Sequence, residues 1–258
     1  MRLVAARCLA LGVGEWLLAK VLRLDCEVYT DWTWSTPMNT RFASPTTVTR
    51  ASLLALFAVQ LAAQTADRLV GKNVSIAQTT YQGRSAVQVI PAPGAANATS
   101  YAVIKDAKFR DGTIEVELAG QPAAGAGGFA RGFIGIAFRL QGDGSYEYIY
   151  LRPTNGRADD QVRRNHSTQY SSYPDFDFAR SRQESPEKYE SYVDLLPGVW
   201  TKYKIEVEGR KARLHVNGAE QPCLIVNDMK LEPRDGGVAL WVGPGTEGYF
   251  SNLKITAK

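Results

Sequence analysis

The sequence from about residue 67 onward predicts an all-β domain, either a sandwich or a barrel. Apolar and polar residues alternate along many short segments, and glycine-rich turns separate these segments at short intervals. No segment of this part shows a convincing apolar stripe with helical spacing. The 12 Tyr and 5 Trp of the chain also favour strands. A single domain is the simplest organisation, because all-β domains often reach about 200 residues as one unit.

The expected strands share this alternation and end at turn residues. The clearest hairpin signal is Gly142-Asp143-Gly144 between two apolar-aromatic segments, and Gln82-Gly83-Arg84 and Gly209-Arg210 predict two more hairpins. In the segment 113–118, the alternation places Ile114, Val116 and Leu118 on the core face. The expected strands are residues 74–79, 86–90, 113–118, 133–139, 146–152, 200–208, 211–216, 223–226, 237–242 and 248–255.

Residues 48–66 have the pattern of a cleaved secretory signal. Arg50 gives the segment a basic start, an apolar core runs from Ala51 to Ala63, and small residues follow. The apolar core is shorter than the roughly 20 residues that a membrane-spanning helix needs. We therefore expect cleavage near residues 63–66, a secreted or periplasmic location in a bacterium, and no membrane span in the mature protein.

Residues 1–47 precede this segment and show no strand pattern. We interpret them as an extension that results from a start codon assigned too early, or as a disordered segment. Translation from Met38 or Val48 would give a signal peptide of ordinary length. The alternative is an anchor helix over residues 9–24, although three charged residues interrupt its apolar pattern. The predicted domain then covers residues 67–258.

Charge and motif content exclude several classes of function. The formal net charge is +4, and no basic helix is present, so nucleic acid is not an expected partner. Cys223 is the only cysteine after the predicted signal, so no internal disulfide is expected. Zinc, P-loop and dinucleotide motifs are absent, and we expect no cofactor. A structural calcium ion is an alternative, although no loop has a complete ligand spacing. Its candidate ligands are Asp159, Asp160, Asp175, Asp177 and Asp228.

Several motifs resemble the concanavalin A-like lectin/glucanase superfamily, and its laminin G-like domains in particular. They are Asp111–Glu117, Gly135–Arg139, Pro197–Trp200, Val216-Asn217-Gly218, Ala239–Gly243 and Tyr249–Ile255. The chain is more loosely similar to bacterial 3-keto-disaccharide hydrolase domains. The resemblance covers about residues 70–256 and implies a jelly-roll sandwich of two curved antiparallel sheets with a carbohydrate site on the concave face. Lectins, glycoside hydrolases, lyases and adhesion modules share this fold, so the resemblance implies no particular reaction.

Glu115 and Glu117 are the first candidates for a catalytic pair. Retaining glycosidases need carboxyl groups about 5–5.5 Å apart, whereas alternate residues of a strand lie roughly 6.5–7 Å apart. The glucanases of the superfamily carry acidic residues at further alternate positions, where this chain has Thr113 and Ala119. We therefore interpret the two glutamates as a solvated strand face.

The stretch from Arg152 to Tyr192 is the stronger candidate, because it is too long for an ordinary loop and rich in polar and aromatic residues. If residues 160–167 form a strand, Gln161, Arg163 and Asn165 share one face and suit sugar hydroxyls or a carboxylate. In the alternative, the arginines pair with acidic neighbours and fasten the loop. The candidate substrate-binding residues are Arg139, Arg152, Gln161, Arg163, Arg164, Asn165, His166, Tyr170 and Tyr189.

The resemblance together with these residues predicts a secreted, lectin-like domain that binds an oligosaccharide or polysaccharide. The alternative is a glycoside hydrolase or polysaccharide lyase on the same fold, and His166, Tyr170 and Arg163 are then the catalytic candidates. His or Tyr would remove a proton from a uronate, and Arg would neutralise the carboxylate. A structural role is the competing interpretation for His166, as for His215 on its expected strand.

Overall fold

The computed structural model describes residues 65–95 and 99–258. The predicted extension, residues 1–47, lies outside the described residues, and so does almost all of the predicted signal peptide, residues 48–66. Within the described part of the chain, no helix is long and apolar enough to cross a membrane.

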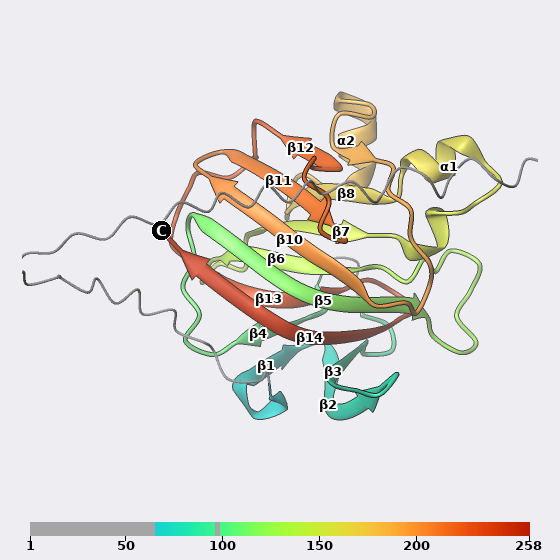
Figure 1. The fold of residues 1–258 in the computed structure, drawn as a ribbon. Helices are drawn as coiled ribbons and strands as arrows, with labels where there is room; N and C mark the ends of the chain where they lie inside the picture. The colour runs from blue at the N-terminus through green and yellow to red at the C-terminus, as the bar shows by residue number, and fades with distance from the viewer. Residues whose placement is uncertain (1–64, 96–98) are drawn as a thin grey trace, which may run out of the picture. The chain divides into compact units, whose positions relative to one another are not determined.

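The described residues form two antiparallel sheets of seven strands each, packed face to face (Figure 1). This arrangement confirms the predicted fold class, a jelly-roll sandwich. The strand order of sheet A is β1 (Leu69–Lys72), β4 (Tyr101–Ile104), β13 (Gly237–Val242), β6 (Ile134–Leu140), β7 (Tyr146–Leu151), β8 (Thr168–Tyr173) and β9 (Glu190–Ser191). The order of sheet B is β12 (Leu224–Val226), β11 (Lys211–Val216), β10 (Thr201–Glu208), β5 (Gly112–Pro122), β14 (Thr246–Ala257), β3 (Arg84–Pro91) and β2 (Val74–Tyr81).

The core lies between the sheets and follows the predicted alternation. Ile114, Val116 and Leu118 of β5 are buried there, as predicted, and Ile136 and Ile149 of sheet A belong to the same cluster. The predicted hairpins β2–β3, β6–β7 and β10–β11 are present with antiparallel pairing. Because side chains alternate along a strand, each inward apolar residue of sheet A leaves its neighbours on the outer face of the sheet.

Helical segments are few and short. The two 3₁₀ turns are η1 (Ala66–Arg68) and η2 (Pro153–Asn155), and the two α-helices are α1 (Gln161–Asn165) and α2 (Phe178–Glu184). The conditional prediction of a strand over residues 160–167 is therefore wrong. Asp160 accepts a hydrogen bond from the backbone N–H of Arg163 at 2.6 Å, and Asp177 accepts one from that of Arg180 at 2.9 Å. These N-caps start the two helices.

Gly135 of β6 allows two large rings to meet on the outer face of sheet A. It pairs with Tyr150 of β7 on one side and with Trp241 of β13 on the other. The Tyr150 and Trp241 ring centroids lie 4.8 Å apart across this position. A Cβ atom at residue 135 would lie 2.2 Å from the carbonyl oxygen of Ile149 and 2.6 Å from the Cα of Tyr150. Glycine is therefore required for β6 and β7 to pair at this distance.

We predict that Gly135→Ala lowers the free energy of unfolding by about 1–3 kcal/mol or more, because the added methyl group forces β6 away from β7. Chemical denaturation followed by circular dichroism measures this change. Gly142→Ala is the matched control, since a Cβ at residue 142 meets nothing within 4 Å. Equal stability of the two variants would contradict the packing argument.

Candidate functional site

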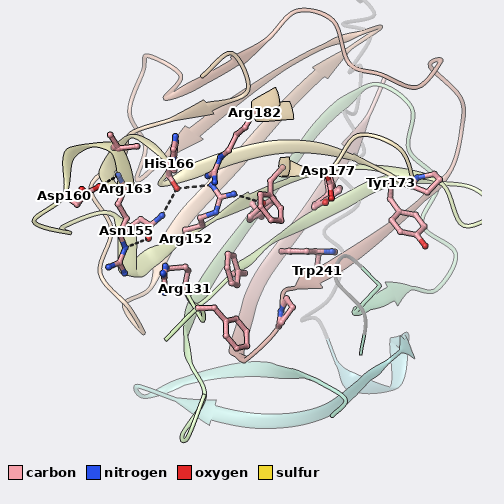
Figure 2. Close-up of a pocket in the computed structure, with 18 residues that line it drawn as sticks. Arg131, Arg152, Asn155, Asp160, Arg163, His166, Tyr173, Asp177, Arg182 and Trp241 are labelled. Atoms are coloured by element: carbon pink, nitrogen blue, oxygen red, sulfur yellow. Dashed lines mark hydrogen bonds between the residues drawn. The ribbon is translucent and has the colours of Figure 1, made fainter. Parts of the chain in front are cut away.

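A cavity with a volume of about 670 Å³ lies on the outer face of sheet A. Strands β7 and β13 form its floor, and the segments around Phe129, α1 and α2 form its walls. Figure 2 shows the lining side chains as sticks. The cavity is lined by Phe129, Arg131, Phe133, Tyr148, Tyr150, Arg152, Asn155, Asp160, Val162, Arg163, His166, Tyr173, Pro174, Asp177, Phe178, Arg182, Trp241 and Pro244.

Aromatic rings cover the floor of the cavity. Tyr148 and Tyr150 alternate along β7 with core residues, and Trp241 of β13 packs against both, with centroid distances of 5.1 and 4.8 Å. These three side chains are buried, whereas Phe129 is 63% exposed and Phe178 is 39% exposed at the edge of the cavity. The exposed rings offer flat apolar faces, and the floor residues Tyr148 and Tyr150 carry hydroxyl groups.

A buried ion pair fixes the polar end of the cavity. The Arg152 guanidinium donates to Glu190 Oε1 at 2.9 Å, to the Tyr150 hydroxyl at 2.8 Å and to Gln169 Oε1 at 2.6 Å. It also donates to the carbonyl oxygen of His166 at 3.1 Å. Its hydrogen bonds thus join the end of β7 to β8, β9 and the residue that follows α1. Tyr150 accepts the bond from Arg152, so its own proton is free to be donated to a ligand.

Glu190 also holds Arg182 and lies close to His166. Arg182 donates two hydrogen bonds to the Glu190 carboxylate, at 2.9 and 2.6 Å. Burial by itself would raise the pKa of Glu190, but the hydrogen bond from Arg182 and the charge of Arg152 outweigh it and hold the pKa below its ordinary value. His166 Nε2 lies 3.5 Å from Glu190 Oε2, and burial nevertheless lowers the pKa of the imidazole. His166 is therefore mainly neutral at pH 7.

Three of the nine predicted binding residues line the cavity: Arg152, Arg163 and His166. Gln161 and Asn165 bond to each other on α1 at 2.8 Å, and Arg164 lies over the Tyr192 ring at 5.5 Å. Gln161, Arg164 and Asn165 do not belong to the lining of the cavity. Because residues 161–165 are helical, Gln161, Arg163 and Asn165 do not share the face that a strand would have given them.

The other three predicted residues, Arg139, Tyr170 and Tyr189, lie on the inner side of sheet A and are buried. Tyr170 donates to Glu147 at 2.6 Å and Tyr189 donates to Asp228 at 2.7 Å. Arg139 donates to Asp111 at 3.0 Å. Burial raises the pKa of Tyr170, so the phenol stays protonated. The structure therefore places these three residues outside the cavity lining, and their predicted binding and catalytic roles stay untested predictions.

The sequence interpretation missed most of the aromatic floor and two arginines. The alternation of Tyr146, Tyr148 and Tyr150 with Ile149 and Leu151 was an available signal for a tyrosine-covered outer face. No comparable local pattern marks the two missed arginines, Arg131 and Arg182, because both lie in segments outside the sheets. The missed lining residues include Phe129, Arg131, Tyr150, Asn155, Asp177, Phe178, Arg182 and Trp241.

Glu115 and Glu117 lie on the outer face of sheet B and form ion pairs with surface cations. Arg84 lies 3.1 Å from Glu117 and Lys254 lies 3.6 Å from Glu115, in agreement with the interpretation as strand-face charges. The two glutamates line a second hollow of about 550 Å³ with His215 of β11.

The five aspartates that are candidate calcium ligands do not come together in one cluster. In the described ranges, no group of three or more His, Cys, Asp or Glu side chains could hold a metal ion. Asp160 and Asp177 cap the two α-helices, and Asp228 lies 2.8 Å from Lys188. A structural calcium ion stays an untested prediction.

Comparison with known proteins gives similarity to solved structures only. No family model matches the chain, and no curated protein matches it. A carbohydrate-binding module from Bacillus subtilis is 14% identical, with a TM-score of 0.48 over 72% of this chain and 93% of the module. A galectin-like protein of unknown function from Bacillus subtilis is 12% identical, with a TM-score of 0.42 over 72% and 86%. An alginate lyase of polysaccharide lyase family 7 is 11% identical, with a TM-score of 0.39 over 66% and 77%. At these values the similarity carries no argument about function.

The Glu190 network predicts a specific pH dependence of stability. Because its pKa is lowered in the folded state, the stabilisation is complete above the ordinary value of 4.5 and is lost as the pH falls through the folded-state value. We expect Glu190→Gln to lower the free energy of unfolding by about 3 kcal/mol at pH 7, because Arg152 is left buried without a carboxylate. Urea denaturation from pH 7 to pH 3 should show this difference shrinking below about pH 4.5.

Glu184→Gln is the control for that series. It removes a carboxylate that pairs with Arg180 at 2.7 Å on the exposed side of α2. The expected change is below about 1 kcal/mol, as for other exposed pairs. If the free energies of unfolding of wild type and Glu190→Gln differed by the same amount at every pH, this would contradict the assignment of the pH dependence to Glu190.

Proposed function

We propose that this chain is a secreted carbohydrate-binding protein that holds a glycan in the cavity on the outer face of sheet A. One observation carries the proposal: exposed aromatic rings and fixed hydrogen-bonding groups lie together in one cavity of about 670 Å³. Sugars have apolar ring faces and a rim of hydroxyl groups, so a site for them needs both kinds of surface. Export rests on the predicted signal peptide, residues 48–66.

The apolar and polar parts of the cavity divide these tasks. Phe129 and Phe178 are the exposed rings on which sugar faces would pack. The Tyr150 hydroxyl has a proton to donate, because its oxygen already accepts a bond from Arg152. Asp160 and Asp177 each use one carboxylate oxygen to cap a helix, and their second oxygens are available to accept from sugar hydroxyls.

The arrangement of carboxylates favours binding over glycoside hydrolysis. Glycosidases need a protonated acid and a second carboxylate across the scissile bond. Asp160 and Asp177 are the carboxylates in the cavity lining, and both are engaged as helix caps. Glu190, beneath the lining, is held ionised by Arg152 and Arg182, so it is unsuited to act as an acid at neutral pH.

A polysaccharide lyase is the second candidate, and His166 is the observation that favours it. The imidazole lines the cavity and its lowered pKa keeps it neutral, as a base requires. In a β-elimination it would take the proton next to a uronate carboxylate. The C–O bond to the leaving sugar would then break as a C=C bond forms, and the leaving oxygen would take up a proton.

Binding is tested with the full chain on a glycan array, followed by calorimetry on the oligosaccharides that bind. We expect Phe129→Ala and Phe178→Ala each to weaken binding about tenfold, through loss of aromatic contact with the sugar. Ile225→Ala is the matched control, because Ile225 is 48% exposed on β12 of the other sheet. Equal losses in all three variants, or no loss in the phenylalanine variants, would contradict this placement of the glycan.

The lyase candidate is tested by incubating the full chain with the bound oligosaccharides and measuring unsaturated products by ultraviolet absorbance. Product that is abolished in His166→Gln but formed by Glu115→Gln would support elimination with His166 as the base. Binding without formation of unsaturated product would overturn the lyase candidate and keep the proposed binding function.

A further inference from the structure

We infer that the cavity selects acidic glycans, with a carboxylate or sulfate ester of the sugar held between Arg131 and Arg163. The inference rests on the proposed binding function and names its ligand class. Both arginines line the cavity, and Figure 2 shows them with Arg152 at the end of the cavity away from Tyr173.

Arg131 enters the cavity without a carboxylate partner among the described residues. Its NH1 group donates to the carbonyl oxygens of Gly128 and Ala130, its own chain neighbours. These bonds orient the guanidinium and leave its other N–H groups for a ligand. An ionised partner would give a shorter and stronger hydrogen bond than a neutral carbonyl does.

Arg163 is held in the same manner from α1. Its Nε donates to Asn155 Oδ1 at 3.0 Å, and its NH2 donates to Thr154 Oγ1 at 3.3 Å. In the described part of the chain, no ion pair within 4 Å joins its guanidinium to a carboxylate. Arg152 and Arg182 differ in this respect, since both share the carboxylate of Glu190.

The charges in this part of the cavity repel one another. Burial lowers the pKa of Arg131, and the charges of Arg163 and Arg152 lower it further. The guanidinium groups of Arg131, Arg152 and Arg163 thus lie around one region of the cavity. Of these three, only Arg152 forms an ion pair with Glu190. Asp160 and Asp177 also line the cavity, but neither forms an ion pair with Arg131 or Arg163. An anion bound between these two arginines would relieve the repulsion.

The position of the arginines agrees with an acidic sugar ring. Two guanidinium groups can each offer a fork of N–H donors to a carboxylate or sulfate. The exposed rings of Phe129 and Phe178 belong to the same cavity and can pack on the sugar ring itself. A free inorganic anion would use the arginines and leave these rings without a role.

The test compares charged and neutral forms of the same sugars with the full chain. The probes are galacturonate oligosaccharides and their carboxyl-reduced products, and sulfated galactan oligosaccharides and their desulfated products. We expect at least about tenfold tighter binding of one or both charged members over their neutral counterparts. The preferred pair then identifies a carboxylate or a sulfate as the recognised group. Rising salt should weaken binding of the charged probe more than that of the neutral probe.

Arg131→Gln and Arg163→Gln should each weaken binding of the charged probe about tenfold and weaken binding of the neutral probe clearly less. Arg157→Gln is the matched control, since Arg157 pairs with Asp194 on the exposed surface at 2.7 Å and lies outside the cavity lining. Thermal denaturation checks that each variant is folded. The salt dependence of the wild-type chain supplies a measurement that needs no variant.

The outcomes separate this inference from the proposed function. Equal binding of charged and neutral probes, lost in Phe178→Ala, would overturn the acidic selectivity and keep the glycan site. Unchanged charged-probe binding in both arginine variants would also overturn the selectivity. Binding of none of the probes or of any glycan on the array would overturn both.

Discussion

The pairing of the Glu190 carboxylate with two arginines is the interaction on which the geometry of the site depends. The carboxylate lies between the guanidinium groups of Arg152 and Arg182, at 2.9 and 2.6 Å, and Arg152 is almost completely buried. A buried guanidinium without a carboxylate has a large desolvation penalty, so these groups are stable only as a set. Through them, β7, β9 and α2 have fixed relative positions, and these elements form much of the cavity.

The two-sheet architecture provides the surface on which this set is placed. Residues of β7 alternate between the core, where Ile149 lies, and the outer face, where Tyr148 and Tyr150 lie. The small residue Gly135 then lets the Tyr150 and Trp241 rings meet across β6. The core packing that stabilises the sandwich therefore also orders the aromatic floor. The walls come from connections outside the sheets, and these carry the arginines and the exposed rings.

The fold could be predicted because its signals are local. Ile114, Val116 and Leu118 alternate within one segment, and turn glycines mark the ends of the hairpins, so strands and core face follow from neighbouring residues. Helix α1 was misread because five residues with one apolar side chain show no helical period. The capping position of Asp160, three residues before Arg163, was its one local signal.

The site could be predicted only in part, because it depends on long-range register. Tyr170 pairs with Ile149 and therefore faces the core, whereas Gln169 pairs with Tyr150 and lies on the outer face. The sequence of β8 alone shows that its residues alternate between two faces, but it does not show which face packs on the core. The role that we propose for Arg131 likewise depends on Arg163, which belongs to another segment of the chain and lines the same cavity. Arg152 and His166 were candidates because they lie in the long polar and aromatic stretch from Arg152 to Tyr192, and the structure places both in the cavity lining.

A crystal structure of the full chain with a bound acidic oligosaccharide tests the central claim most directly. We predict a sugar ring in the cavity on sheet A, in contact with Phe129 or Phe178, and its acidic group within hydrogen-bond distance of Arg131 and Arg163. A sugar bound instead in the hollow beside Glu115 and His215 on sheet B would contradict it. So would a sugar in the sheet A cavity with its acidic group directed away from both arginines.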